Sequence, residues 1–133
     1  MTLPNKNLIK EWLYKADGDF EAAIKLFKSK SKKKLYYVIA FHCQQAIEKY
    51  LKALLLCHKI DFPKIHDLLQ LLKLLINKDT LLIAIKNDLQ KLNPFAVSFR
   101  YPGEDITLEE LKEALIITKR LNKLLLKRIK EFL

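Results

Sequence analysis

Glycine and proline are scarce in this chain, which has two glycines and four prolines among its 133 residues. A fold with many tight turns needs more of both, so the composition argues against a sandwich or barrel of short strands. The two glycines lie far apart, which excludes a glycine-rich phosphate loop. Half of the residues are hydrophobic, which is too many for a disordered chain. The composition therefore favours a helical protein.

Long apolar runs and paired cysteines are also missing. No run approaches the roughly 20 apolar residues that a membrane span requires, and Pro4, Asn5 and Lys6 do not fit a secretory signal. Cys43 and Cys57 lie on one predicted helix, about 21 Å apart along its axis, so they cannot form a disulfide within the chain. Neither has a partner at the spacing of a zinc site. We expect a soluble, cytoplasmic protein without metal or cofactor.

Arginine is scarce relative to lysine. The formal net charge is +10, yet only Arg100, Arg120 and Arg128 are arginines. Phosphate and base recognition favours the planar arginine fork, whereas a lysine-rich surface also serves solubility. The positive charge is therefore compatible with an anionic partner but does not demand one.

Helical periodicity is what the sequence has in abundance. Apolar residues recur at three- and four-residue spacing, and the predicted helices span residues 5–28, 35–59, 66–76, 80–92 and 107–133. Pro63 is expected to stop the second helix, and Thr107 and Glu110 have the spacing of a capping box at the start of the last. We predict a single domain over residues 1–133, all-α, folded as an up-and-down antiparallel bundle of four to five helices.

The second predicted helix is apolar almost all the way round, except for one narrow polar wedge. At about 100° per residue, the wedge occupies roughly a third of the circumference and consists of His42, Gln45, Glu48, Lys49 and Lys52. A row of donors and cations suits a phosphate or nucleotide lying in a groove, which makes His42, Gln45, Lys49 and Lys52 ligand-binding candidates. The alternative is that these groups pair within the protein, for example Glu48 with Lys52 at i,i+4 spacing.

Four motifs in a fixed order resemble those of one known family. They are Trp12-x-x-x-Ala16-x-x-Asp19-x-x-x-Ala23, the block AFHCQQAIEKYLKAL at 40–54, His66-Asp67-Leu68, and Phe99-Arg100-Tyr101-Pro102. In order and spacing they resemble the HEPN domain over nearly the whole chain. The block at 40–54 is the most specific of the four.

The resemblance implies a helical bundle that dimerises, often beside a minimal nucleotidyltransferase in a toxin–antitoxin-like gene pair. Many HEPN proteins are metal-independent endoribonucleases, in which His follows Arg after four to six intervening residues. In this sequence no histidine follows Arg100, Arg120 or Arg128 at that spacing. We therefore expect a non-catalytic or regulatory module that binds a nucleotide or RNA phosphate, a nucleotidyltransferase partner, or both.

Two other hypotheses stay open. An endoribonuclease toxin with a divergent active site would use His66, Arg100 and His42, because the reaction needs a base near neutral pKa and a cation for the phosphate. A purely structural dimer subunit would have a wedge whose polar groups all pair internally. Arg100 and Tyr101 are further ligand-binding candidates, since the first could fork a phosphate and the second could stack on a base. They could equally pin their loop onto the bundle.

Overall fold

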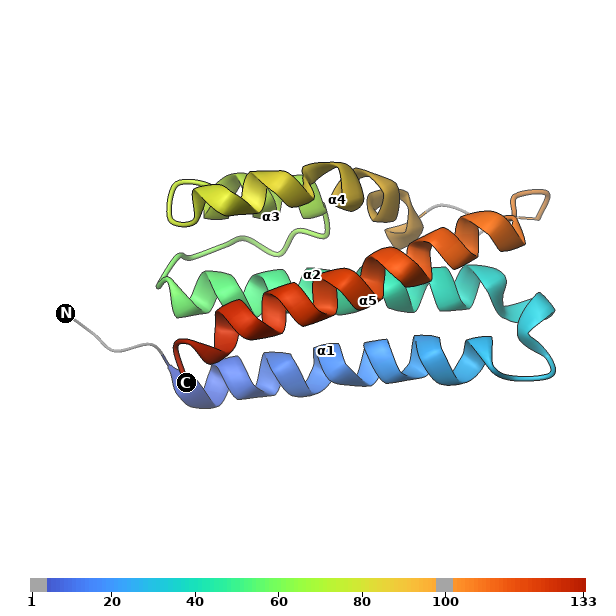
Figure 1. Cartoon of the computed structure of the whole chain (residues 1–133), viewed down its shortest axis with the longest axis horizontal. Coiled ribbons are helices and arrows are strands. Elements are labelled where there is room, and N and C mark those ends of the chain that lie inside the picture. The colour runs from blue at the N-terminus through green and yellow to red at the C-terminus, as the bar shows by residue number, and fades with distance from the viewer. Residues whose placement is uncertain (1–4, 98–101) are drawn as a thin grey trace.

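The computed structural model describes residues 5–97 and 102–133. In these two stretches the chain forms five α-helices and no strand, which confirms the predicted all-α bundle (Figure 1). The helices are α1 (Lys6–Phe27), α2 (Tyr36–Cys57), α3 (Leu68–Leu75), α4 (Lys86–Leu92) and α5 (Leu108–Lys130). No helix in the described residues combines the length and the low polarity that crossing a membrane requires.

Helix α2 is the centre of the bundle. It contacts α1, α3 and α5, and Figure 1 shows it between α1 and the layer formed by α3 and α4. Most of its side chains are buried, as its nearly unbroken apolar surface predicts. Each buried Ile or Leu contributes about 1.5–3 kcal/mol. Cys43 and Cys57 are buried among them as free thiols.

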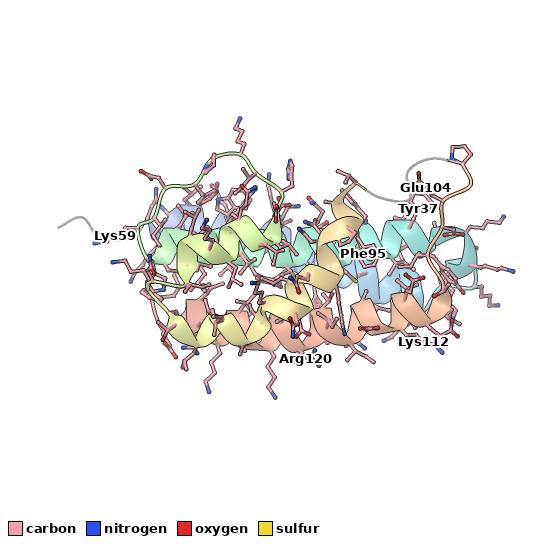
Figure 2. The ribbon with its side chains drawn as sticks, turned by 90° about the horizontal axis from the view of Figure 1, so that it is seen from above. Tyr37, Lys59, Phe95, Glu104, Lys112 and Arg120 are labelled. Carbon is pink, nitrogen blue, oxygen red and sulfur yellow. The ribbon has the colours of Figure 1, made fainter. Side chains whose placement is uncertain are left out.

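Helix α2 ends in a Schellman-type turn several residues before Pro63. The backbone N–H of Ile60 donates to the carbonyl of Leu55 (2.9 Å), and the N–H of Lys59 donates to that of Leu56 (3.0 Å). Lys59, labelled in Figure 2, adopts the left-handed conformation with a φ of 59°. Glycine is the usual residue at this position because it carries no Cβ. The helix was predicted to run to residue 59 and ends at Cys57, because this turn ends it before the proline is reached.

Residues 58–67, here called the return segment, run back along α2 to the start of α3. The side-chain amide of Gln44 donates to the carbonyl of His66 (3.0 Å), which ties the far end of the segment to the middle of α2. Asp67 then caps α3 by accepting from the N–H of Leu69 (2.9 Å). The helix predicted over 66–76 therefore begins only at Leu68, and His66 lies before it.

The helix predicted over 80–92 has two parts. Residues Thr80–Ile85 form a 3₁₀ helix, and the α-helix begins only after them. Leu82 and Ile85 are buried three residues apart, while Leu81 is exposed. A 3₁₀ helix repeats every three residues and so places both buried side chains on one side.

Helix α5 begins with the predicted capping box. The N–H of Glu110 donates to the Thr107 hydroxyl, and the N–H of Thr107 donates to the Glu110 carboxylate, both at 3.1 Å. Further along, the Arg120 guanidinium donates to Asp88 of α4 (2.8 Å), and Figure 2 shows Arg120 where α5 passes α4. The cap fixes where α5 begins, and the ion pair ties it to the α3–α4 layer.

Candidate functional site

The wedge of α2 faces α1 on one side and the return segment on the other, and each of its side chains has a partner within the chain. Toward α1 the partner is Asp19. One Asp19 oxygen lies 2.8 Å from His42 Nδ1, and the other accepts from Lys49 Nζ at 2.5 Å. His42 thus bonds to a carboxylate of the neighbouring helix. The same carboxylate compensates the charge of Lys49.

The ionisation of Asp19 reflects these contacts. Burial disfavours the charged carboxylate and by itself would raise its pKa, but the hydrogen bonds and positive charges of His42 and Lys49 outweigh that effect. The pKa of Asp19 therefore lies below its ordinary value of 3.8. Asp19 is a carboxylate throughout the neutral range and holds α1 against α2.

Glu48 is the second centre of pairing. Its side chain is almost completely buried, with 2 % of the residue exposed. Lys52 Nζ donates to it at 3.0 Å, and His66 Nδ1 lies 3.0 Å from the same oxygen. The amides of Gln44 and Gln45 donate to its other oxygen at 3.3 Å. The predicted pairing of Glu48 with Lys52 is confirmed.

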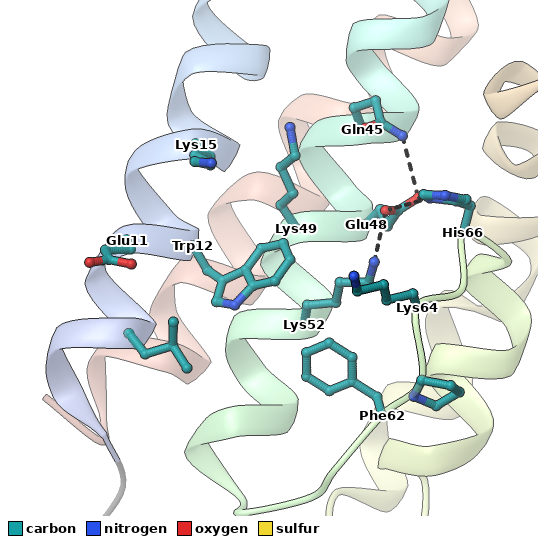
Figure 3. Close-up of a pocket in the computed structure, with 12 residues that line it drawn as sticks. Glu11, Trp12, Lys15, Gln45, Glu48, Lys49, Lys52, Phe62, Lys64 and His66 are labelled. Carbon is teal, nitrogen blue, oxygen red and sulfur yellow. Dashed lines mark hydrogen bonds and ion pairs between the residues drawn. The ribbon is translucent and has the colours of Figure 1, made fainter.

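The Glu48 network forms one wall of a pocket of about 570 Å³, shown in Figure 3. Trp12 of α1 and Phe62 of the return segment stand edge to face, with ring centroids 6.2 Å apart. Lys52 Nζ lies 5.5 Å from the Trp12 centroid and 5.9 Å from that of Phe62. With Glu48 on its other side, the Lys52 ammonium is enclosed, and only 5 % of the residue is exposed. Its positive charge is therefore largely compensated by the Glu48 carboxylate and the two aromatic rings.

Two other lysines line the pocket without being neutralised in this way. Lys15 comes from α1 and Lys64 from the return segment, and both are exposed. Neither forms an ion pair with any residue in the described part of the chain. We call Lys15 and Lys64 the rim lysines. Together with Glu11, which is also exposed and lines the pocket, they place two ammonium groups and one carboxylate at its edge.

The structure brings together some of the predicted site residues. Gln45, Lys49, Lys52 and His66 all line this pocket. His42 does not line the pocket, because it lies nearer the beginning of α2, against Asp19. Arg100 and Tyr101 fall outside the described residues.

Seven lining residues outside the wedge were not predicted as site residues: Leu8, Glu11, Trp12, Lys15, Phe62, Pro63 and Lys64. Trp12, Lys15 and Asp19 recur on α1 at three- to four-residue spacing and so share one face. That face could have indicated the partner of the wedge, because buried polar groups on one helix require polar partners on a neighbouring helix. Phe62 and Lys64 flank Pro63, and only the course of the return segment brings them to α2.

No group of three or more His, Cys, Asp and Glu side chains in residues 5–97 and 102–133 is arranged to hold a metal ion. Burial raises the pKa of each cysteine thiol to about 11, so neither supplies a thiolate near neutral pH. The side chains that line the pocket supply ammonium groups, an imidazole, an amide, carboxylates and aromatic rings.

The sequence model of the HEPN domain family matches residues 9–129, which is nearly the whole chain. No curated protein matches the sequence of this chain.

Proposed function

The chain belongs to the HEPN domain family, and on that premise we propose that it is a non-catalytic binding module for a nucleotide or an RNA phosphate. The ligand would occupy the pocket between α1, α2 and the return segment. The observation that carries the proposal is the combination of two aromatic rings with two rim lysines that lack ion-pair partners among the described residues.

A nucleotide joins a flat, weakly polar base to a strongly anionic phosphate. Trp12 and Phe62 offer an aromatic surface for the base, and Lys15 and Lys64 offer ammonium groups for the phosphate. The volume of about 570 Å³ lies within the usual range for small-ligand pockets, roughly 300–1,000 Å³. Lys49 remains a candidate, although its pairing with Asp19 makes the rim lysines the stronger source of free charge.

The test is calorimetric titration of the protein with AMP, with ATP and with a short RNA. We expect at least one to bind, and we expect the Lys15→Ala, Lys64→Ala double variant to weaken it about tenfold or more, which corresponds to about 1.4 kcal/mol. The matched control is Lys73→Ala with Lys86→Ala, which removes two exposed lysines from α3 and α4. Failure of all three ligands to bind, or equal binding by the rim variant, contradicts the proposal.

We also propose that the module forms a homodimer and works beside a minimal nucleotidyltransferase, as family membership suggests. Co-expression with such an enzyme followed by size-exclusion chromatography with light scattering tests both points. A monomeric mass for the protein alone contradicts the homodimer. Separate elution of the two proteins contradicts the partnership.

A second candidate is a purely structural subunit, and one observation favours it. Every wedge side chain has a partner within the chain, and no buried side-chain nitrogen or oxygen in the described residues lacks one. Such a wedge holds the bundle together without any ligand. If this function is the right one, the calorimetric titrations show no heat, while variants of Glu48 and Asp19 still lose stability.

The endoribonuclease alternative rests on His66. Its side chain is 67 % exposed, and its Nδ1 is bonded to the Glu48 carboxylate, an arrangement that orients an imidazole for proton transfer. His42 bonds to a different carboxylate, Asp19, and does not line the pocket. Among the described residues, His66 is therefore the one histidine at the pocket that could act as the base. Our proposal predicts that the metal-free protein leaves RNA intact. Cleavage that disappears in His66→Ala would establish the nuclease.

A further inference from the structure

A second concave surface lies between α1 and α5, away from the proposed nucleotide pocket. Both helices pack against α2 but touch each other little. Two hollows of about 340 and 250 Å³ lie between them and share Ile24, so together they form one groove, here called the α1–α5 groove. It extends along α1 from Asp17 to Lys28, a rise of about 16 Å or three helical turns.

The floor of the α1–α5 groove is apolar. Phe20, Ile24 and Phe27 line it from α1, and Leu115 and Ile116 line it from α5. Ile116 is 61 % exposed, although a large aliphatic side chain is more stable when covered. Beside it Phe20, Ile24 and Phe27 are partly exposed, and such a row marks a surface that another apolar face can cover.

One end of the groove is strongly basic. Lys28, Lys112 and Lys119 line it, all three are exposed, and none forms an ion pair with a described residue. Figure 2 shows Lys112 near the beginning of α5. Close by, Lys32 Nζ lies 4.6 Å from the ring centroid of Phe27. The groove therefore combines an apolar floor with one basic end, whereas Asp17 and Glu21 line its other end.

We infer that the α1–α5 groove docks an amphipathic helix of a partner protein, with Asp or Glu flanking the apolar stripe of that helix. Apolar side chains at i, i+3, i+4 and i+7 would cover the floor over about two turns. The flanking carboxylates would face Lys28, Lys112 and Lys119, which orients the helix and speeds its association. This inference is independent of the nucleotide pocket.

An RNA strand suits this surface less well. RNA-binding surfaces rely on arginine and other polar groups that contact phosphate and on aromatic rings that stack on bases. The lining of the basic end contains no arginine, and aliphatic side chains make up much of its floor. An apolar floor gains most from another apolar surface, which a helix provides and a phosphate backbone does not.

The probe is an 18-residue fluorescein-labelled helical peptide with Leu at i, i+3, i+4 and i+7 and Glu on the flanks. A second peptide has Lys in place of each Glu, and a decauridine RNA serves as the third probe. Fluorescence anisotropy measures binding to the wild type and to two double variants. The first is Lys112→Glu with Lys119→Glu in the groove, and the matched control is Lys73→Glu with Lys86→Glu on α3 and α4, which changes the net charge equally.

We expect the acidic peptide to bind the wild type and the control alike and to lose at least tenfold in affinity for the groove variant. The basic peptide should show the opposite preference, and Ile116→Ser should weaken both peptides. Circular dichroism verifies that each variant is folded. The inference is overturned if the acidic peptide does not bind, if both peptides bind the wild type equally, or if only the RNA binds and loses affinity for the groove variant.

Discussion

Replacing Glu48 by Gln should destabilise the protein by about 3 kcal/mol. The carboxylate is buried and accepts from Lys52, Gln44 and Gln45, and His66 Nδ1 lies 3.0 Å from it. The amide of Gln has nearly the same shape but carries no charge, so Lys52 would be left as a buried cation without its counterion. Breaking a buried pair in this way costs about 3–5 kcal/mol. The lower end applies because the new amide oxygen still accepts a hydrogen bond.

The expected shift in melting temperature follows from the size of the chain. At about 2.1 cal/mol/K per residue, 133 residues give an unfolding entropy of roughly 280 cal/mol/K. A loss of about 3 kcal/mol then lowers the melting temperature by about 10 °C. Circular dichroism at 222 nm follows the loss of helix on heating. Urea titration, monitored by fluorescence of Trp12, the only tryptophan, gives the free energy of unfolding independently.

Two further variants identify the cause of the loss. Glu48→Gln combined with Lys52→Met removes the unpaired cation and puts a thioether against Trp12 and Phe62, so we expect the double variant to be more stable than Glu48→Gln alone. Glu113→Gln is the control, because Glu113 pairs with Lys91 (2.6 Å) where both side chains are more than half exposed; its midpoint should equal that of the wild type.

The expected role of the Glu48–Lys52 pair is refuted if Glu48→Gln melts within about 2 °C of the wild type, a shift that corresponds to less than about 0.6 kcal/mol. It is also refuted if Lys52→Met makes Glu48→Gln still less stable. The first result would mean that the network contributes little, and the second that Lys52 stabilises the fold by packing and not through its charge.

Three other predictions concern single residues. Because the pKa of Asp19 is lowered in the folded state, its ionisation stabilises the fold above the unfolded pKa of about 3.9, and this contribution is lost as the pH falls through the folded pKa. Urea midpoints measured from pH 6 to pH 2.5 should therefore fall less steeply for Asp19→Asn than for the wild type. Parallel curves for the two proteins would contradict this prediction. Lys59→Gly should raise stability by about 1 kcal/mol, since glycine adopts the left-handed conformation without strain, and an unchanged or lower midpoint in urea would argue against it. Cys43 and Cys57, with thiol pKa values of about 11, should not react with Ellman's reagent at pH 8 until guanidinium unfolds the protein, and a fast-reacting thiol in the native protein would show that a cysteine is accessible.

Most of the fold could be predicted from the sequence because its long helices carry their own signals. The three- and four-residue spacing of apolar residues located α1, α2 and α5, and Thr107 with Glu110 marked where α5 begins. The 3₁₀ helix at Thr80–Ile85 was not predicted, because a run of apolar residues does not reveal which of them will be buried. The turn at Lys59 was hidden for a related reason, since a lysine carries no sequence signal for left-handed backbone.

The candidate site was predictable only in outline. A polar wedge on an apolar helix has to find partners, and this physical requirement pointed to the right part of α2. The identity of those partners was not available, because Asp19 meets Lys49 only when α1 and α2 pack side by side. The pocket depends still more on tertiary structure, since Phe62 and Lys64 reach it only because the return segment runs back along α2.

The proposed nucleotide site is tested most directly by NMR titration of ¹⁵N-labelled protein with AMP, ATP and a short RNA in turn. Trp12 gives the only indole N–H signal in the spectrum, because it is the only tryptophan. We predict that this signal and the backbone amides of Lys15, Lys64 and His66 shift together and saturate at one dissociation constant. Signals that stay in place with all three ligands, or that shift only outside the pocket between α1, α2 and the return segment, would contradict the proposed function.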